Sequence, residues 1–168
     1  MIEESFFKSN KSAAAYLYGH LKNKTPIKIQ KGLYFLWAFY AGTYGNLDYS
    51  APSEFQSEKY PRQLFEPNFE AWRYGPVDNE IWKLDKNDEL KDYSAAVNGK
   101  INSEIQNDVM MFLDDLINQI DDINDFGLVE RSHQDQAWKD AFARSNEHDH
   151  QPIDAAAIKE DYVAYVKE

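Results

Sequence analysis

The sequence contains no cysteine. This absence excludes disulfides, thiolate zinc sites, iron–sulfur clusters and cysteine nucleophiles. The seven glycines are scattered, so no glycine-rich loop is available to cradle a phosphate, and the G-x-S-x-G pattern of elbow-type hydrolases is missing as well. We therefore predict no cofactor, and we do not expect an enzyme.

Long apolar runs and basic residues are also scarce. The longest apolar run, residues 32–42, is about half as long as a membrane span requires. The N-terminus MIEESFFKSN is acidic, unlike the basic start of a signal peptide. Lys and Arg number 18 against 29 Asp and Glu, and the net charge of −11 opposes binding to nucleic acid or anionic lipid. These patterns predict a soluble, cytoplasmic protein that binds neither membranes nor nucleic acid.

The residues that are present predict one mainly α-helical domain. The chain has 168 residues, 43% of them hydrophobic and 15% aromatic, which is enough for a substantial core. It has no internal repeat and no linker long enough to separate two domains. We therefore expect a single compact helical domain over residues 1–168, with room for one small β-hairpin.

Apolar spacing and capping residues place the helices. Thr25 and Pro26 predict the start of the most apolar helix, over 26–43, which should be central. Ser103 and Gln106 resemble a capping box before a second long helix. The expected helices are 12–23, 26–43, 104–123, one from Ser132 or Asp135 through Phe142, and one after Asp154. Residues 46–68 are expected to cross the surface, and 87–100 to contain a short extended piece.

The stretch FEAWRYGPVDNEIW, residues 69–82, predicts a corner between a strand and a helix. Alternation over 69–74 favours a short strand. Pro76 suits the first position of a helix, and Asp78 and Glu80 would then fall in its first turn. Those acids disfavour a phosphate at this helix start.

Two patterns have the residue types of a catalytic or metal site. His148, Asp149 and His150 lie in a polar connection without a second histidine pair, so a solvated loop is favoured and no metal site is predicted. Ser132, His133 and Asp135 are sequence neighbours, whereas triads assemble from separated segments. We favour Ser132 as a helix cap, and a small hydrolase that pairs His133 with Asp135 or Glu70 remains the alternative of another class.

The helix predicted over 104–123 has a strongly acidic face. It carries Asp114, Asp115, Asp121 and Asp122. A solvated helix surface is the favoured interpretation, and a face that binds a basic protein is the alternative.

Three stretches together resemble the Panacea domain, a phage-associated family linked to antitoxins of toxin–antitoxin systems. They are KIQKGLYFLWAFYAGTYG (28–45), LFEPNFEAWRYGPVDNEIW (64–82) and GLVERSHQDQAWKDAF (127–142). The resemblance implies an antitoxin that neutralises a cognate toxin by direct binding, with the toxin encoded in the neighbouring reading frame and with no cofactor. It leaves two alternatives: an adaptor that delivers the toxin to a protease, or a phage protein that acts on a host defence system.

Within the matching stretches we expect two groups of residues, although the cations Lys28, Lys31 and Arg73 of the second group could equally be tethered to nearby acids. The expected structural residues are Tyr34, Trp72, Gly75, Pro76, Val77 and Trp138. The expected partner-binding residues, which are less easily explained as core, are Lys28, Lys31, Arg73, Tyr74 and His133.

Overall fold

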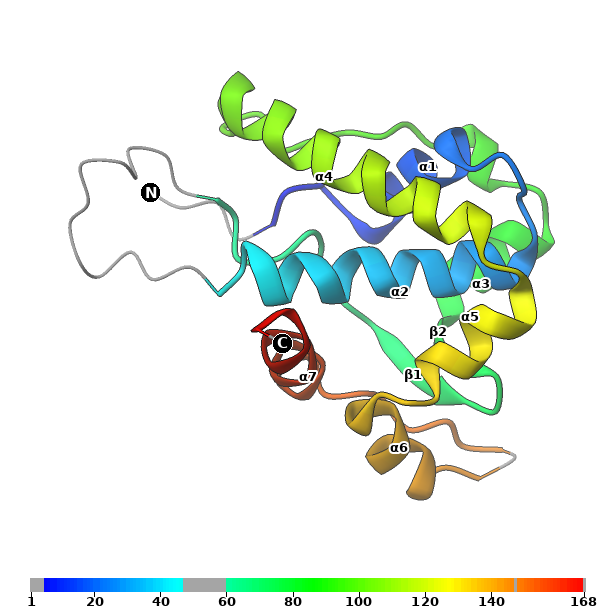
Figure 1. Cartoon of the computed structure of the whole chain (residues 1–168). Coiled ribbons are helices and arrows are strands. Elements are labelled where there is room, and N and C mark those ends of the chain that lie inside the picture. The colour runs from blue at the N-terminus through cyan, green and yellow to red at the C-terminus, as the bar shows by residue number, and fades with distance from the viewer. Residues whose placement is uncertain (1–4, 47–59, 147, 168) are drawn as a thin grey trace.

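The computed structural model describes residues 5–46, 60–146 and 148–167. This part of the chain forms seven α-helices and one two-stranded hairpin, with the other elements arranged around the helix α2 (Pro26–Thr43) (Figure 1). The helices are α1 (Asn10–His20), α2 (Pro26–Thr43), α3 (Asn79–Lys86), α4 (Ser103–Asp122), α5 (Asp125–Ser132), α6 (Gln136–Ala143) and α7 (Ala155–Lys167). The strands are β1 (Phe69–Trp72) and β2 (Gly75–Asp78). The predicted mainly α fold with a small hairpin is confirmed.

Helix α2 runs through the middle of the molecule (Figure 1) and packs against α1, α3, α4, α5 and α7, as well as β2. Thr25 is its N-cap, with the side-chain oxygen accepting the Lys28 N–H at 3.0 Å, and Pro26 is its first residue. Ile29, Leu33, Leu36 and the other core residues of α2 are almost completely buried. A helix that is apolar on all sides is stable only when it is enclosed, so the prediction of a central helix over 26–43 is confirmed.

Helices α2 and α7 pack closely at Gly42 of α2, which has no side chain. A Cβ atom on Gly42 would lie 2.8 Å from the backbone carbonyl carbon and oxygen of Tyr162. The absence of a side chain at position 42 therefore sets how closely the C-terminal helix approaches the centre of the molecule.

The hairpin differs from the corner that the sequence predicts. Arg73 and Tyr74 form a two-residue turn, and β2 then pairs antiparallel with β1, placing Pro76 opposite Ala71. The prediction that Pro76 begins a helix is therefore wrong, and Val77 belongs to the strand. Gly75 has φ +108°, which lets the chain reverse at once. The N–H of Ala71, opposite Pro76, donates away from β2 to the Gln151 carbonyl at 2.9 Å. This pair of residues exchanges no hydrogen bond, so the missing N–H of Pro76 costs the hairpin nothing.

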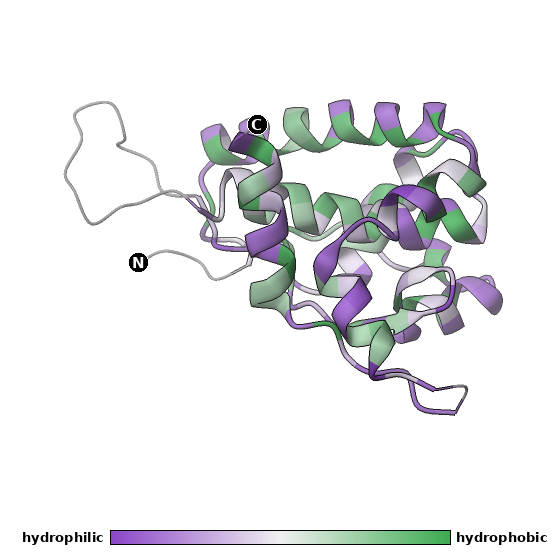
Figure 2. Ribbon diagram, turned by 60° about the horizontal axis from the view of Figure 1, so that its bottom comes forward, coloured by the Kyte–Doolittle hydropathy of each residue, from purple (hydrophilic) through white to green (hydrophobic). Residues whose placement is uncertain are grey.

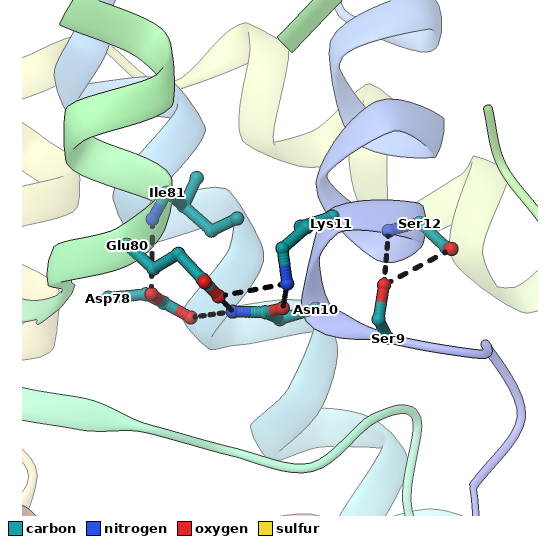
Figure 3. Close-up of polar contacts among 7 residues, drawn as sticks. All are labelled: Ser9, Asn10, Lys11, Ser12, Asp78, Glu80 and Ile81. Atoms are coloured by element: carbon teal, nitrogen blue, oxygen red, sulfur yellow. Dashed lines mark hydrogen bonds and ion pairs between the residues drawn. The ribbon is translucent and has the colours of Figure 1, made fainter. Parts of the chain in front are cut away.

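The helix after the hairpin begins at Asn79, because Asp78 is its N-cap. The Asp78 carboxylate accepts the Ile81 N–H at 3.2 Å, and its second oxygen accepts from Asn10 at 2.9 Å (Figure 3). Asn10 also donates to Glu80 at 2.9 Å, and Lys11 lies 3.2 Å from the same carboxylate. Burial raises the pKa of Asp78, whereas the hydrogen bond from Asn10 lowers the pKa of Glu80. This polar cluster joins the start of α1 to the start of α3.

Helix α4 follows the predicted helix over 104–123 closely, but its cap is one residue earlier. Asn102, rather than Ser103, is the N-cap and accepts the Ile105 N–H at 2.9 Å, while Gln106 donates to the Ile101 carbonyl. Asparagine is at least as good an N-cap as serine. Hydrophobic and hydrophilic residues alternate along the outer helices (Figure 2), as expected for helices buried on one face.

Helix α5 was not predicted. Of the two expected starts for the next helix, Ser132 is wrong and Asp135, the N-cap of α6, is confirmed. Asn124 caps α5 through the Gly127 N–H at 2.8 Å, and Ser132 is the last residue of that helix. Helix α6 then begins at Gln136. An eight-residue helix with a glycine near its start gives little periodic signal, so the sequence pattern shows only a connection there.

Three other expectations concern the connections and the chain ends. Residues 87–100 contain a 3₁₀ turn, Leu90–Asp92, and the extended part is limited to a bridge between Val97 and Phe7. Most of the surface crossing predicted for 46–68 lies outside the described residues. Helix α7 follows Asp154 as predicted. Among the described residues, no helix has the length and apolar character needed to span a bilayer.

Substitution of Gly42 tests the close packing of α2 on α7. We expect Gly42→Ala to lower the free energy of unfolding by about 1–3 kcal/mol, because the added methyl group would meet the Tyr162 backbone. Urea unfolding followed by circular dichroism measures the change. Gly19→Ala is the matched control, since a Cβ there meets nothing within 4 Å on an exposed helical position. Equal behaviour of the two variants would contradict this packing.

Candidate partner-binding site

The turn of the hairpin presents two of the expected contact residues. Arg73 and Tyr74 connect Trp72 to Gly75, and both side chains are exposed, with Tyr74 at 59%. The Arg73 guanidinium lies 5.8 Å from the centre of the Tyr74 ring. Because tyrosine and arginine are enriched among the residues that carry binding energy at interfaces, this exposed pair makes the turn a candidate contact point.

Residues at the junction between α5 and α6 bond to the backbone of this turn. A ring nitrogen of His133, Nε2, lies 2.9 Å from the Arg73 carbonyl oxygen, and the imidazole stacks on Trp138 with the ring centres 4.2 Å apart. The Trp138 indole N–H donates to the Trp72 carbonyl at 3.0 Å, and Phe142 stacks on its other side. His133 and Trp138 therefore fix the backbone of the hairpin turn.

The outer side of β1 extends the same surface. The Trp72 indole N–H donates to Glu70 at 2.9 Å, and its ring stacks on His150 with centres 4.4 Å apart. Beside it lies a shallow pocket of about 200 Å³, lined in part by Arg73, Phe142 and His150. We name Arg73, Tyr74, His133, Phe142 and His150 the hairpin-tip surface. The structure thus brings together three of the five expected contact residues.

The two expected lysines point into the protein. Lys28 is 5% exposed and donates to the Asp121 carbonyl at 2.6 Å, at the C-terminal end of α4. Lys31 is 1% exposed and donates to the Pro76 carbonyl at 2.9 Å. Burial lowers the pKa of Lys31 to about 7. In this arrangement both ammonium groups are bonded to internal carbonyls and lie away from the hairpin-tip surface.

Gly75 packs against two further residues beneath the turn, Ser132 and Lys31. A Cβ atom at this position would collide with the Ser132 hydroxyl and would lie 2.8 Å from the side chain of Lys31. The backbone of the hairpin therefore rests directly on α2 and on the end of α5.

A buried carboxylate, Asp135, organises the junction between α5 and α6. Of its partners, the sequence singled out only Tyr34, as a structural residue. Asp135 accepts from the hydroxyls of Tyr34 and Tyr162, each at 2.6 Å, and pairs with Arg131 at 2.9 Å. Burial and neighbouring charge, including that of Asp135, raise the pKa of both tyrosines well above the ordinary value. A tyrosine in the middle of the most apolar helix was the available signal, because a buried hydroxyl requires a partner.

The residues weighed for catalysis are not assembled into a relay. The Ser132 hydroxyl donates to the Val129 carbonyl, His133 bonds to the Arg73 carbonyl, and Glu70 accepts from Trp72. Asp135 is occupied by two tyrosines and an arginine. Within the described residues, none of these four side chains is hydrogen-bonded to another, whereas a nucleophile, base and orienting group must be.

The described residues also include no group of three or more histidines and acids arranged to hold a metal ion. His150 stacks on Trp72, and Asp149 accepts from the Gln151 side chain at 2.8 Å. His150 therefore lies against the hairpin.

Comparison with known families identifies the fold. The family model described as "Antitoxin SocA-like, Panacea domain" matches residues 53–139, a little over half of the chain. The chain belongs to the Panacea family. No curated protein matches it, and no solved structure does either. Membership implies an antitoxin role, a toxin as partner and a protein that is usually not an enzyme.

The residues matched by the family model include the hairpin and the helix that supports it. The matched residues include all of β1, β2 and α5, and they end inside α6 just after Trp138. The first block, 28–45, lies outside the matched residues, although α2 forms the centre on which the Panacea hairpin packs.

The two tryptophans of the hairpin region should contribute differently to the free energy of unfolding. Trp138 is 7% exposed and in the core, whereas Trp72 is half-buried on the outer side of β1. We expect Trp138→Ala to cost roughly 3–5 kcal/mol of unfolding free energy and Trp72→Ala about 1–2 kcal/mol. Urea unfolding measures both. An equal loss would contradict the difference in packing.

The buried ammonium of Lys31 predicts a pH dependence of stability. Its pKa is lower in the folded state than in the unfolded chain, so the unfolded chain binds more protons between about pH 7 and 10. The unfolding free energy of the wild type minus that of Lys31→Met should therefore rise with pH in this window, by up to about 1.4 kcal/mol per pH unit. Urea unfolding at pH 7.5, 8.5 and 9.5 measures it, and a constant difference would refute the prediction.

Proposed function

We propose that this Panacea protein neutralises a toxin by direct, stoichiometric binding, and that the hairpin-tip surface is a principal contact. The observation that carries this proposal is the exposed Arg73–Tyr74 turn on a rigid support. Tyrosine and arginine dominate the binding energy of many interfaces. His133 and Trp138 hold the turn in place before binding, which reduces the conformational entropy lost on association.

The electrostatics favour a toxin with a basic contact surface. The chain carries a net charge of −11, and complementary charge accelerates association and selects among partners. Arg73 is the one arginine of the hairpin-tip surface, which has no lysine, so it would pair with a carboxylate of the toxin and fix the orientation of the complex.

Co-expression tests the function. The product of the neighbouring reading frame should arrest growth when it is expressed alone and should be harmless beside this chain. Under direct masking, the abundance of that product should stay unchanged. A fall in its abundance would instead indicate delivery to a protease, and a harmless neighbour would contradict the pairing altogether.

The variant Arg73→Ala/Tyr74→Ala tests the contact surface. We expect it to weaken binding to the toxin at least tenfold, because it removes two interface anchors, while leaving the melting temperature within a few degrees of wild type. Affinity is measured with purified proteins by calorimetry. Tyr93→Ala is the matched control, since Tyr93 is also an exposed tyrosine, at 40%, and lies beside α3. Full affinity of the double variant would exclude the hairpin tip as a contact.

A further inference from the structure

A second feature of the surface is an apolar groove between α2, α4, α5 and α7. It encloses about 450 Å³. Phe35 and Phe39 of α2 contribute to it from the centre, Phe112, Leu116 and Ile123 line it from α4, and Tyr165 lines it from α7. We name this feature the α4 groove. Its lining includes no residue of the hairpin-tip surface.

Large apolar side chains around the α4 groove remain exposed to solvent. Two of the lining residues, Ile123 and Tyr165, are 41% and 49% exposed. Met111, one helical turn before the lining residue Asp115 on the same side of α4, is 72% exposed. A small ligand inside the groove would not cover these flanking side chains, whereas a protein segment lying along it would.

The length of the groove suits a helix. Its lining runs along α4 from Phe112 to Ile123, which corresponds to about 16 Å at the rise of an α-helix. Three turns of an amphipathic helix span this distance and place apolar side chains at i, i+3, i+4 and i+7 against it.

The charge around the groove indicates a basic segment. Helix α4 carries six Asp and Glu residues and neither Lys nor Arg. Asp115 lines the groove, and Asp122, seven residues later on the same face, is exposed. The one cation in the lining, Arg131, is paired with Asp135 at 2.9 Å and lies 4.7 Å from the centre of the Tyr165 ring. The charge that remains free along α4 is negative.

We infer that the α4 groove docks an amphipathic helical segment of a protein partner, with an apolar face and lysines or arginines beside it. Apolar side chains of the segment fill the space between α4 and α7, and its cations meet Asp115 and Asp122. This surface is separate from the hairpin tip, and the inference does not depend on which face contacts the toxin.

A groove-specific fluorophore tests this inference on the full chain. Because the sequence has no cysteine, Gln119→Cys places one label in the groove lining, and Lys83→Cys places a control label on α3. The probe is a 14-residue helical peptide with leucines at i, i+3, i+4 and i+7 and lysines elsewhere. Its counterpart has glutamate in place of every lysine. The lysine peptide should shift the emission at position 119 but not at position 83, and it should bind at least tenfold more tightly than the glutamate peptide.

Two variants separate apolar docking from charge attraction. Ile123→Asn should weaken the lysine peptide at least tenfold, whereas Tyr93→Asn, a polar substitution at a similarly exposed position, should not. Asp115→Asn/Asp122→Asn should weaken it several-fold and reduce its dependence on salt. Equal binding of the two peptides, equal response of the two labels, or full affinity of Ile123→Asn would overturn the inference. So would an apolar dye that fills the groove and is displaced by neither peptide.

Discussion

A two-stranded hairpin is marginally stable in water by itself, and here it is held in place by buried polar groups of α2. The Gln30 side-chain amide accepts from the Asp78 N–H at 2.8 Å and donates to the Asp78 carbonyl at 3.3 Å. Side chains from one turn of α2 thus bond the backbone groups on the outer edge of β2, as a third strand would. Lys31 adds the bond to the Pro76 carbonyl, and Gln30 and Lys31 are both nearly inaccessible to solvent.

The other side of the hairpin is fixed by the C-terminal part of the chain. The Ile153 N–H donates to the Phe69 carbonyl at 2.8 Å, and the Gln151 carbonyl accepts from Ala71. The two short strands are therefore bonded on both edges, and the Arg73–Tyr74 turn projects from a rigid base. This explains how four-residue strands can present a fixed surface to a partner. It also explains the role of Lys31, which was expected at the contact surface and instead supports the hairpin from inside the protein.

The two candidate surfaces differ in chemistry. The hairpin-tip surface has one arginine, two histidines and two exposed aromatic rings over a stacked support of Trp138, and it offers directional contacts. The α4 groove is apolar with carboxylates beside it, so it can accept apolar side chains and attract positive charge. Both surfaces depend on α5, because Arg131 lines the groove and pairs with Asp135 at the α5–α6 junction. The residues that distinguish them, Arg73 and Tyr74 at the tip and Ile123 in the groove, lie on different elements and share no lining.

The sequence alone determined the parts of this protein that depend on local pattern. Thr25-Pro26 and the continuous apolar run after it identified α2 and its central place, and regular spacing identified α4. The combined motifs pointed to the Panacea family, which the family match confirms. Of the five contact residues expected within those motifs, the structure brings Arg73, Tyr74 and His133 to one surface, whereas Lys28 and Lys31 are buried.

Only the tertiary structure decided which way side chains point and which partners they find. Pro76 can begin a helix or lie in an unbonded strand position, and the choice depends on Gly75, Gln30 and Gln151, which are far apart in the chain. Lys28 and Lys31 read as surface cations because nothing local reveals the carbonyls that accept their hydrogen bonds. The partners of Asp135 come from α2, α5 and α7, and the α4 groove exists only where four helices fail to fill the space between them. Capping and periodicity act over a few residues, whereas burial, pairing and cavities depend on contacts across the whole fold.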